Sequence, residues 1–240
     1  MPGSQELTPT ILTPPVGGQT QFSLSTKNVS RGEVIVTYRG IAGNQPATYK
    51  NNLALWNGSL PNMTVQPLRV VAIKSDNQPD SLPFEFDFEP TDYCLTYQVG
   101  EGISTMCAMT SLSFSMKARI LRAMAFWRWT NLAATPPEAV SIKIVKITTD
   151  SVQIIYNTLP GYQPQKFGNW IGLWPGWAIP YGSPEPLARA KVDSAFSQGI
   201  VTLEPVSLYS GLSYTITYFM ESPDKDEHHL SAAALLYFSV

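Results

Sequence analysis

Hydrophobic and polar residues alternate along most of the chain with the two-residue period of a β-strand. In the segment 33–38, EVIVTY, the side chains of Val34, Val36 and Tyr38 fall on one face and the others on the opposite face. The alternating segments are short, and connections rich in glycine and proline separate them. This pattern predicts many short antiparallel strands and little helix.

The alternation predicts about seven strands in each half of the chain, with turns every ~8 to 12 residues. In the first half they are 21–26, 33–38, 52–56, 68–73, 84–88, 93–99 and 106–118; in the second half they are 141–147, 151–156, 169–174, 187–192, 200–203, 214–219 and 233–239. Such a series is typical of an immunoglobulin-like or fibronectin-like antiparallel β-sandwich. We therefore expect an all-β protein.

The two halves are copies of one unit. With a constant offset, Gly32–Gly58 aligns without a gap on Asp150–Gly176. The identical pairs are Val34/Val152, Tyr38/Tyr156, Gly43/Gly161, Gln45/Gln163, Pro46/Pro164, Asn51/Asn169, Leu55/Leu173, Trp56/Trp174 and Gly58/Gly176. The repeat predicts two tandem sandwich modules, residues 13–118 and 134–240. Residues 1–12 are expected to be a flexible tail, and residues 119–133 a linker.

The linker, RILRAMAFWRWTNL, has no counterpart in the repeat. Ile120, Met124 and Trp127 recur at helical spacing, which favours a short helix. The simplest interpretation is a connector whose Trp127 and Trp129 pack between the modules. A basic helix lying on a membrane is the alternative, but the arginines flank both sides of the helical wheel, so membrane contact through residues 119–133 is not expected.

Two segments resemble a strand of known immunoglobulin-like modules. Leu53-Ala-Leu-Trp56 and Asn169-Trp-Ile-Gly-Leu-Trp174 are similar to the Asp-Trp-Ile-Gly-(Ile/Leu)-(Phe/Tyr) strand of SKICH domains and of the N-terminal sandwiches of purple acid phosphatases. Asn51 and Asn169 stand where that strand has its aspartate. The resemblance implies an immunoglobulin-like fold. It implies no active site, because in those proteins the sandwich accompanies a separate catalytic domain.

Composition and charge reduce the number of functions and locations that we expect for this protein. The net charge is −2, and neither module has the basic face that binding to a nucleic-acid backbone requires. The N-terminus has no signal-peptide pattern, and no apolar run approaches ~20 residues, so a soluble cytoplasmic protein is expected. Cys94 and Cys107 could face each other on neighbouring strands, but buried free thiols are the favoured state.

The chain carries no recognisable catalytic constellation. It has two histidines, His228 and His229, and no nucleophile-elbow, zinc-protease or phosphate-loop motif. Asp224, Asp226 and His228 could offer ligands to a metal, but the string falls where the last hairpin turns, and a polar solvated turn is the favoured interpretation. We therefore expect neither an enzyme nor a cofactor.

The two copies differ most in their aromatic residues. Trp170 and Trp177 replace Asn52 and Ser59 of the first copy, and Tyr162 and Tyr181 are added nearby. Because the first copy folds without them, these residues are candidates for a ligand-binding surface. They could equally close the interface between the modules. Trp174, which is matched by Trp56, is expected in the core of its sandwich.

Three functions compete at this stage. The favoured one is a non-catalytic binding or adaptor protein whose second module binds a carbohydrate or a protein through the aromatic patch. The alternative is a structural protein that self-associates through edge strands into a homo-oligomer. The third is an effector or a hydrolase accessory protein with an unrecognised site.

Overall fold

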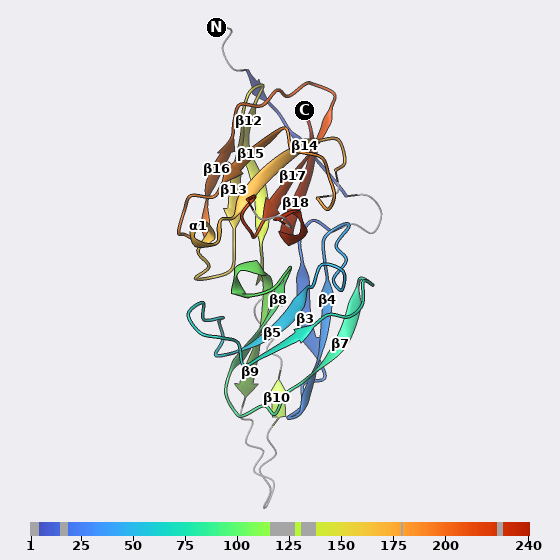
Figure 1. Cartoon of the computed structure of the whole chain (residues 1–240), viewed down its shortest axis with the longest axis vertical. Coiled ribbons are helices and arrows are strands. Elements are labelled where there is room, and N and C mark those ends of the chain that lie inside the picture. The colour runs from blue at the N-terminus through green and yellow to red at the C-terminus, as the bar shows by residue number, and fades with distance from the viewer. Residues whose placement is uncertain (1–4, 15–18, 116–127, 131–137, 179, 225–227) are drawn as a thin grey trace, which may run out of the picture.

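The computed structural model describes residues 5–14, 19–115, 128–130, 138–178, 180–224 and 228–240. Antiparallel strands dominate these residues, which confirms the all-β prediction (Figure 1). The helical elements that the structure describes are one turn of α-helix, α1 (Pro164–Phe167), and the 3₁₀ turns η1 (Ile103–Thr105) and η2 (His228–Ser231).

Two sheets of the first half pack face to face. One has the order β3-β4-β7, and the other contains β9-β8-β5-β6. The strands are β3 (Ser23–Lys27), β4 (Glu33–Arg39), β5 (Asn52–Asn57), β6 (Arg69–Ala72), β7 (Asp80–Glu85), β8 (Tyr93–Gln98) and β9 (Met106–Ser115). The ring of Tyr38 on β4 lies 5.7 Å from that of Tyr97 on β8, between the two sheets.

The second half repeats this order. Its sheets contain β12-β13-β16 and β18-β17-β14-β15. The strands are β12 (Ser141–Thr148), β13 (Val152–Asn157), β14 (Trp170–Pro175), β15 (Ala188–Lys191), β16 (Gln198–Leu203), β17 (Ser213–Phe219) and β18 (Ala232–Ser239). Tyr156 and Tyr218 meet between the sheets at 5.9 Å, as Tyr38 and Tyr97 do in the first half.

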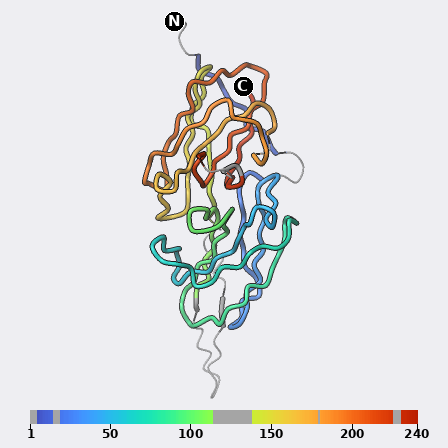
Figure 2. The backbone as a smooth tube through the Cα atoms, viewed as in Figure 1, coloured from blue at the N-terminus to red at the C-terminus, as the bar shows by residue number. Residues whose placement is uncertain are grey.

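Each half also lends strands to the other half. β1 (Glu6–Leu7) pairs with β12 and β2 (Thr10–Leu12) with β18, so the N-terminal segment belongs to the sheets of the second half. In return, β10 (Arg128–Thr130) and β11 (Glu138–Ala139) pair with β9 of the first half. Figure 2 shows the N-terminal segment running along the half formed by C-terminal residues before it enters its own half.

The exchange corrects two predictions. Residues 6–7 and 10–12 are paired strands, not part of a flexible tail, because their backbone groups find partners at sheet edges that the sequence pattern does not reveal. Of the expected linker 119–133, the structure describes only 128–130, which form a strand and not a helix. The predicted packing of Trp127 and Trp129 lies outside what the structure describes.

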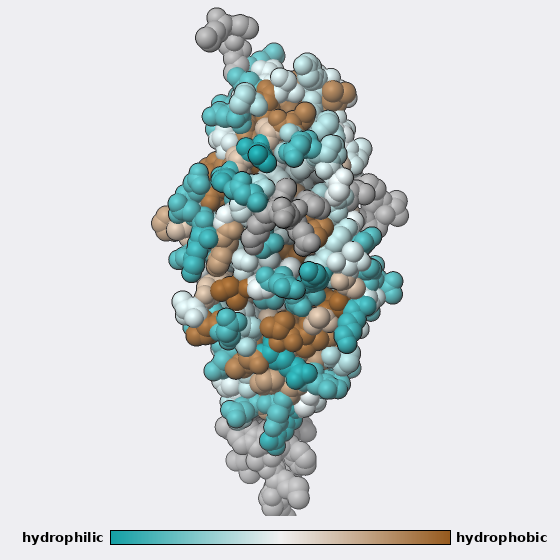
Figure 3. Space-filling model, in the orientation of Figure 1, coloured by the Kyte–Doolittle hydropathy of each residue, from teal (hydrophilic) through white to brown (hydrophobic). Residues whose placement is uncertain are grey.

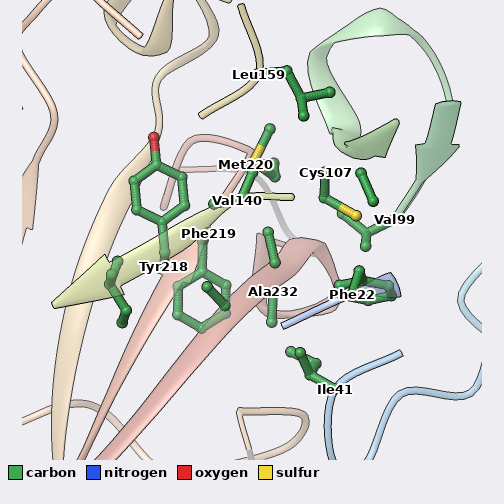
Figure 4. Close-up of a cluster of buried hydrophobic side chains, with 14 of the residues drawn as sticks. Phe22, Ile41, Val99, Cys107, Val140, Leu159, Tyr218, Phe219, Met220 and Ala232 are labelled. Carbon is green, nitrogen blue, oxygen red and sulfur yellow. The ribbon is translucent and has the colours of Figure 1, made fainter. Parts of the chain in front are cut away.

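A single hydrophobic core runs through both halves. Figure 4 shows Val99 and Cys107 of the first half in one buried cluster with Val140 and Met220 of the second half. The backbone N–H of Val140 donates to the Cys107 carbonyl (2.8 Å), and that of Leu235 donates to the Thr20 carbonyl (2.8 Å). The halves are therefore joined by buried side chains as well as by strand pairing.

The repeated tryptophans are buried, as expected, but not between the sheets. Along β14 the inward positions are Ile171 and Leu173, so Trp174 lies on the outward face of its sheet. There its Nε1 donates to the Pro184 carbonyl of the following loop (2.6 Å). Trp56 occupies the same position in the first half and donates to Thr96 Oγ1 (2.9 Å). The fold thus buries the outward-facing tryptophan in each half, in the second half beneath the loop that carries Pro184.

Removing residues 1–14 should destabilise the second half, because β12 and β18 then lose paired edges. We expect a loss of several kcal/mol in the free energy of unfolding, at ~1 kcal/mol for each lost backbone hydrogen bond. Urea unfolding monitored by circular dichroism measures it. Removing residues 1–8, which takes away β1 but keeps β2, should give a smaller loss. An unchanged unfolding midpoint for the longer deletion would show that the crossing strands do not support the fold.

Candidate functional site

The four candidate aromatic residues do not form one surface. Tyr162 and Trp170 are buried, with 1% and 2% of their surface exposed. Tyr181 is partly buried against the core, whereas Trp177 is 48% exposed. The predicted patch therefore separates into a buried stack, a pair of interface residues and one exposed ring.

Trp170 belongs to the buried stack on the outward face of β14. Its ring lies 4.2 Å from that of Phe219, nearly parallel to it, and 6.2 Å from that of Trp174. Between these rings, a side chain at Gly172 would overlap both tryptophans, so the close packing requires glycine there.

Two shallow hollows border this stack. One, of about 230 Å³, is lined by Trp170, Arg189, Lys191 and Asp224 among others; the second, of about 180 Å³, lies beneath the loop 180–186. Both are smaller than the roughly 300 to 1,000 Å³ of most small-molecule sites. The stack therefore serves the fold and offers little room for a ligand.

Tyr162 and Tyr181 connect the two halves. The Tyr162 hydroxyl donates to the Ser104 carbonyl of the first half and accepts from Asn169 Nδ2 (3.1 Å). The Tyr181 hydroxyl lies 3.3 Å from Asn44 Oδ1 of the first half, and the Tyr181 ring stacks on that of Tyr49 at 4.7 Å. These contacts make both residues part of the interface between the halves, which was the alternative in the sequence analysis.

The repeat supplies matching hydrogen bonds on each side of this interface. Asn51 accepts from the Tyr97 hydroxyl (2.8 Å), and Asn169 accepts from the Tyr218 hydroxyl (2.8 Å). Burial raises the pKa of the Tyr97 and Tyr218 hydroxyls well above the ordinary value, so both remain donors across the physiological range. Asn51 and Asn169 stand where the similar strand of SKICH domains has its aspartate. Both asparagines are buried, and their side chains bond within the fold.

Trp177 is the exposed candidate, and its backbone is held firmly. Thr215 Oγ1 donates to the Gly176 carbonyl (2.6 Å) and accepts from the Ala178 N–H (3.0 Å), so it fixes the residues on both sides of Trp177. The Trp177 ring packs on that of Tyr237, which is buried, at 4.9 Å. The ring and its backbone are therefore both held by contacts within the second half.

More apolar surface lies at the same end of the second half. The Gly176 N–H donates to the Ser213 carbonyl (2.7 Å). This bond places the backbone of Trp177 near that of Leu212, because each is the neighbouring residue in its own segment. Leu212 is 51% exposed and Tyr209 63% exposed. We call Trp177, Tyr209 and Leu212 the distal aromatic end. On the one face that Figure 3 shows, hydrophobic residues lie among polar ones in the upper part of the molecule.

The comparison between copies singles out this end. Trp177 corresponds to Ser59 and Leu212 to Thr91, while the anchoring Thr215 corresponds to Cys94. Sequence analysis found Trp177 but missed Leu212, Tyr237 and the anchoring role of Thr215. The replacement of Cys94 by Thr215 was visible in the repeat, but only the structure shows that its hydroxyl holds the Trp177 loop.

The proposed metal ligands show no metal geometry in the part of the chain that the structure describes. Asp224 is exposed and pairs with Lys191 Nζ at 3.1 Å; this contact and the Ser222 hydroxyl lower its pKa. Within the described residues no group of three or more histidine, cysteine or acidic side chains could hold a metal ion. Asp226 and the side chain of His228 lie outside the described part.

Cys94 and Cys107 are free and buried, which confirms the prediction of buried thiols. Burial raises the pKa of Cys94 to about 12 and that of Cys107 well above its ordinary value, so neither thiol ionises at neutral pH. Neither has the lowered pKa of a catalytic cysteine. Among the residues described, no helix has the length and apolarity to cross a membrane.

No protein-family model matches the chain, and no curated protein matches it either.

Replacing Trp170 and Trp177 by alanine should separate their roles. Trp170→Ala should destabilise the protein by about 3 to 5 kcal/mol, because it empties the space beside Phe219. Trp177→Ala should change the stability by only about 0.5 kcal/mol, because nearly half of the ring is exposed. Urea unfolding of both variants measures the difference. Equal losses would place the two rings in the same environment and contradict this assignment.

Proposed function

We propose that the protein is a non-catalytic binding protein. It consists of two immunoglobulin-like sandwiches joined into one body, and its distal aromatic end binds a partner. The observation that carries the proposal is Trp177: an exposed ring held in place by Thr215 and Tyr237 at a position where the other copy has Ser59.

Strand order and a local motif support the immunoglobulin-like or fibronectin-like part of the proposal. Each half pairs a three-strand series with a four-strand series in the same order, as such sandwiches do. The Tyr93 hydroxyl accepts from the Glu89 N–H (3.0 Å), and the Tyr214 hydroxyl accepts from the Tyr209 N–H (2.8 Å). This contact resembles the tyrosine corner of immunoglobulin-like domains. The likeness to SKICH and purple acid phosphatase sandwiches remains a proposal about fold.

Pre-ordering makes Trp177 well suited to binding. A mobile side chain loses rotamer freedom when it enters an interface, and this loss costs about 0.5 to 1.5 kcal/mol of binding free energy. Trp177 has already lost most of that freedom in the free protein, because its ring rests on Tyr237 and its backbone is anchored on both sides. Tryptophan is also among the residues that most often dominate binding energy at interfaces.

The partner should offer a flat apolar face with polar groups around it. A sugar ring fits this description, and so does a protein surface that receives the Trp177 ring; the Tyr209 hydroxyl and the backbone of the loops offer hydrogen bonds at the rim. We place carbohydrate first, because stacking on one anchored ring suffices for it. The proposal includes no cofactor, catalytic step or nucleic acid.

A glycan array probed with the full chain tests the carbohydrate assignment, followed by titration of each bound glycan with tryptophan fluorescence as the signal. We expect Trp177→Ser, which restores the residue of the first copy, to weaken binding at least tenfold with the unfolding midpoint unchanged. Thr215→Cys keeps the ring but removes its anchoring hydroxyl, so it should weaken binding by a smaller factor.

Leu60→Ser, at an exposed leucine of the first half, is the matched control and should bind as the parent does. Glycan binding that survives Trp177→Ser would contradict the assigned site. An array without any bound glycan would remove carbohydrate and leave a protein partner for the same ring.

A further inference from the structure

The edge strand β16 has the features of a strand that pairs with another chain. It ends the sheet β1-β12-β13-β16, and within the described residues no strand pairs with its outer edge. All six of its residues, QGIVTL, are uncharged, and none is proline. Its pairing with β13 runs without a bulge from Gln198 to Leu203. Charge, proline and bulges are the usual devices that prevent edge pairing.

The register shows which backbone groups point outward. Thr158 N–H donates to the Ser197 carbonyl (2.7 Å), so Ser197 and every second residue after it face β13. The alternate residues, Gln198, Ile200 and Thr202, therefore direct their N–H and C=O groups away from the sheet. Ile200 is the central residue of the three, and its side chain is 60% exposed.

The corresponding edge of the first half is blocked. β7 ends the sheet β3-β4-β7. Phe86 N–H donates to the Gly32 carbonyl (3.1 Å), so the residues of β7 that face outward are Ser81, Pro83 and Glu85. Pro83 has no N–H to offer, and Glu85 adds a charge. The same fold thus has one edge that resists pairing and one that permits it.

β15 of the opposite sheet lies close to β16, and the room beside the edge is a groove between the two strands. This groove, of about 430 Å³, is lined by Tyr156, Lys191, Asp193, Ile200 and Thr202 among others. Phe196, just before the strand, is 78% exposed. Lys191 and Asp193 carry opposite charges, so the groove does not repel a second copy of itself.

We propose that two copies of this chain form a dimer by antiparallel pairing of β16 with β16 about a twofold axis at Ile200. In this register Ile200 faces Ile200 of the second copy, and Gln198 faces Thr202. Every outward N–H and C=O group of the strand then has a partner, and the two isoleucine side chains pack together. The uncharged strand is complementary to itself, which is why the occupant is a second copy and not a charged peptide.

The contact is small, because it consists of one short strand and its flanking side chains. Interfaces well below ~1,200 Å² are usually weak, so we expect a dimer that forms only at high protein concentration.

Sedimentation velocity of the full chain without ligand, from ~1 to ~300 µM, tests this proposal. The mass should rise with concentration from 26.4 kDa towards twice that value. Ile200→Lys places two charges side by side at the axis and should weaken the dimer at least tenfold. Thr202→Pro copies Pro83 of the first half and should do the same. The amides of Gln198, Ile200 and Thr202 should exchange more slowly with solvent at high concentration.

Val70→Lys is the matched control, because Val70 is 51% exposed on another edge strand, β6; this variant should dimerise normally. Trp177→Ser should also dimerise normally, so a failure of partner binding is distinguishable from a failure of the dimer. A constant 26.4 kDa species, a dimer that persists in Ile200→Lys, or equal loss in Val70→Lys would each overturn the proposal. If Thr202→Pro does not fold, Ile200→Lys decides.

Discussion

The structure depends on strands that cross from one half of the chain to the other. The segment before each sandwich pairs with the last strand of the opposite sandwich, as β2 does with β18 and β10 with β9. Because the exchange is reciprocal, each half has sheet edges that are paired by a segment from outside its own seven strands. The shared core of Figure 4 lies where these crossings bring the halves together. The two halves therefore share paired strands and a hydrophobic core, and are not connected by a linker alone.

A polar network reinforces this junction. Tyr162 and Tyr181 each bond to an acceptor of the opposite half. Tyr162 also bonds to the buried pair Asn169–Tyr218, and the acceptor of Tyr181 belongs to the buried pair Asn44–Tyr97. Polar groups removed from water are stable only when they are bonded, so this junction tolerates little displacement of one half against the other. The network therefore holds the two halves in one relative orientation.

Much of the fold could be predicted from the sequence, because alternation and the internal repeat are local signals. The strand Glu33–Arg39 and its copy Val152–Asn157 lie where the pattern placed them. By contrast, the alternation of residues 84–88 led to the wrong boundary: β7 ends at Glu85, and Phe86 and Phe88 instead pack with Tyr93. The crossing strands could not be predicted, because alternation identifies a strand without saying which sheet it joins.

The candidate site was predicted only in part, for a similar reason. Comparison of the copies showed that the fold does not require large rings at positions 170 and 177, but it could not show which ring faces water. Trp170 is covered because Phe219 stands opposite it on β17, a pairing set by register. Trp177 lies just beyond the end of β14, and one side of its ring packs on Tyr237 of β18 while the rest is exposed. Outward and inward positions of a strand differ by one residue, and only the structure fixes which face is covered.

Amide hydrogen exchange of the native protein in low concentrations of urea tests most directly whether the halves form one cooperative body. The slowest amides of β8 in the first half and of β17 in the second half are the ones to compare. Reciprocal strand exchange predicts that both sets open with the same free energy and the same dependence on urea, because neither sandwich opens alone. Exchange of one set at a free energy several kcal/mol below the other would contradict it and would show two independent modules.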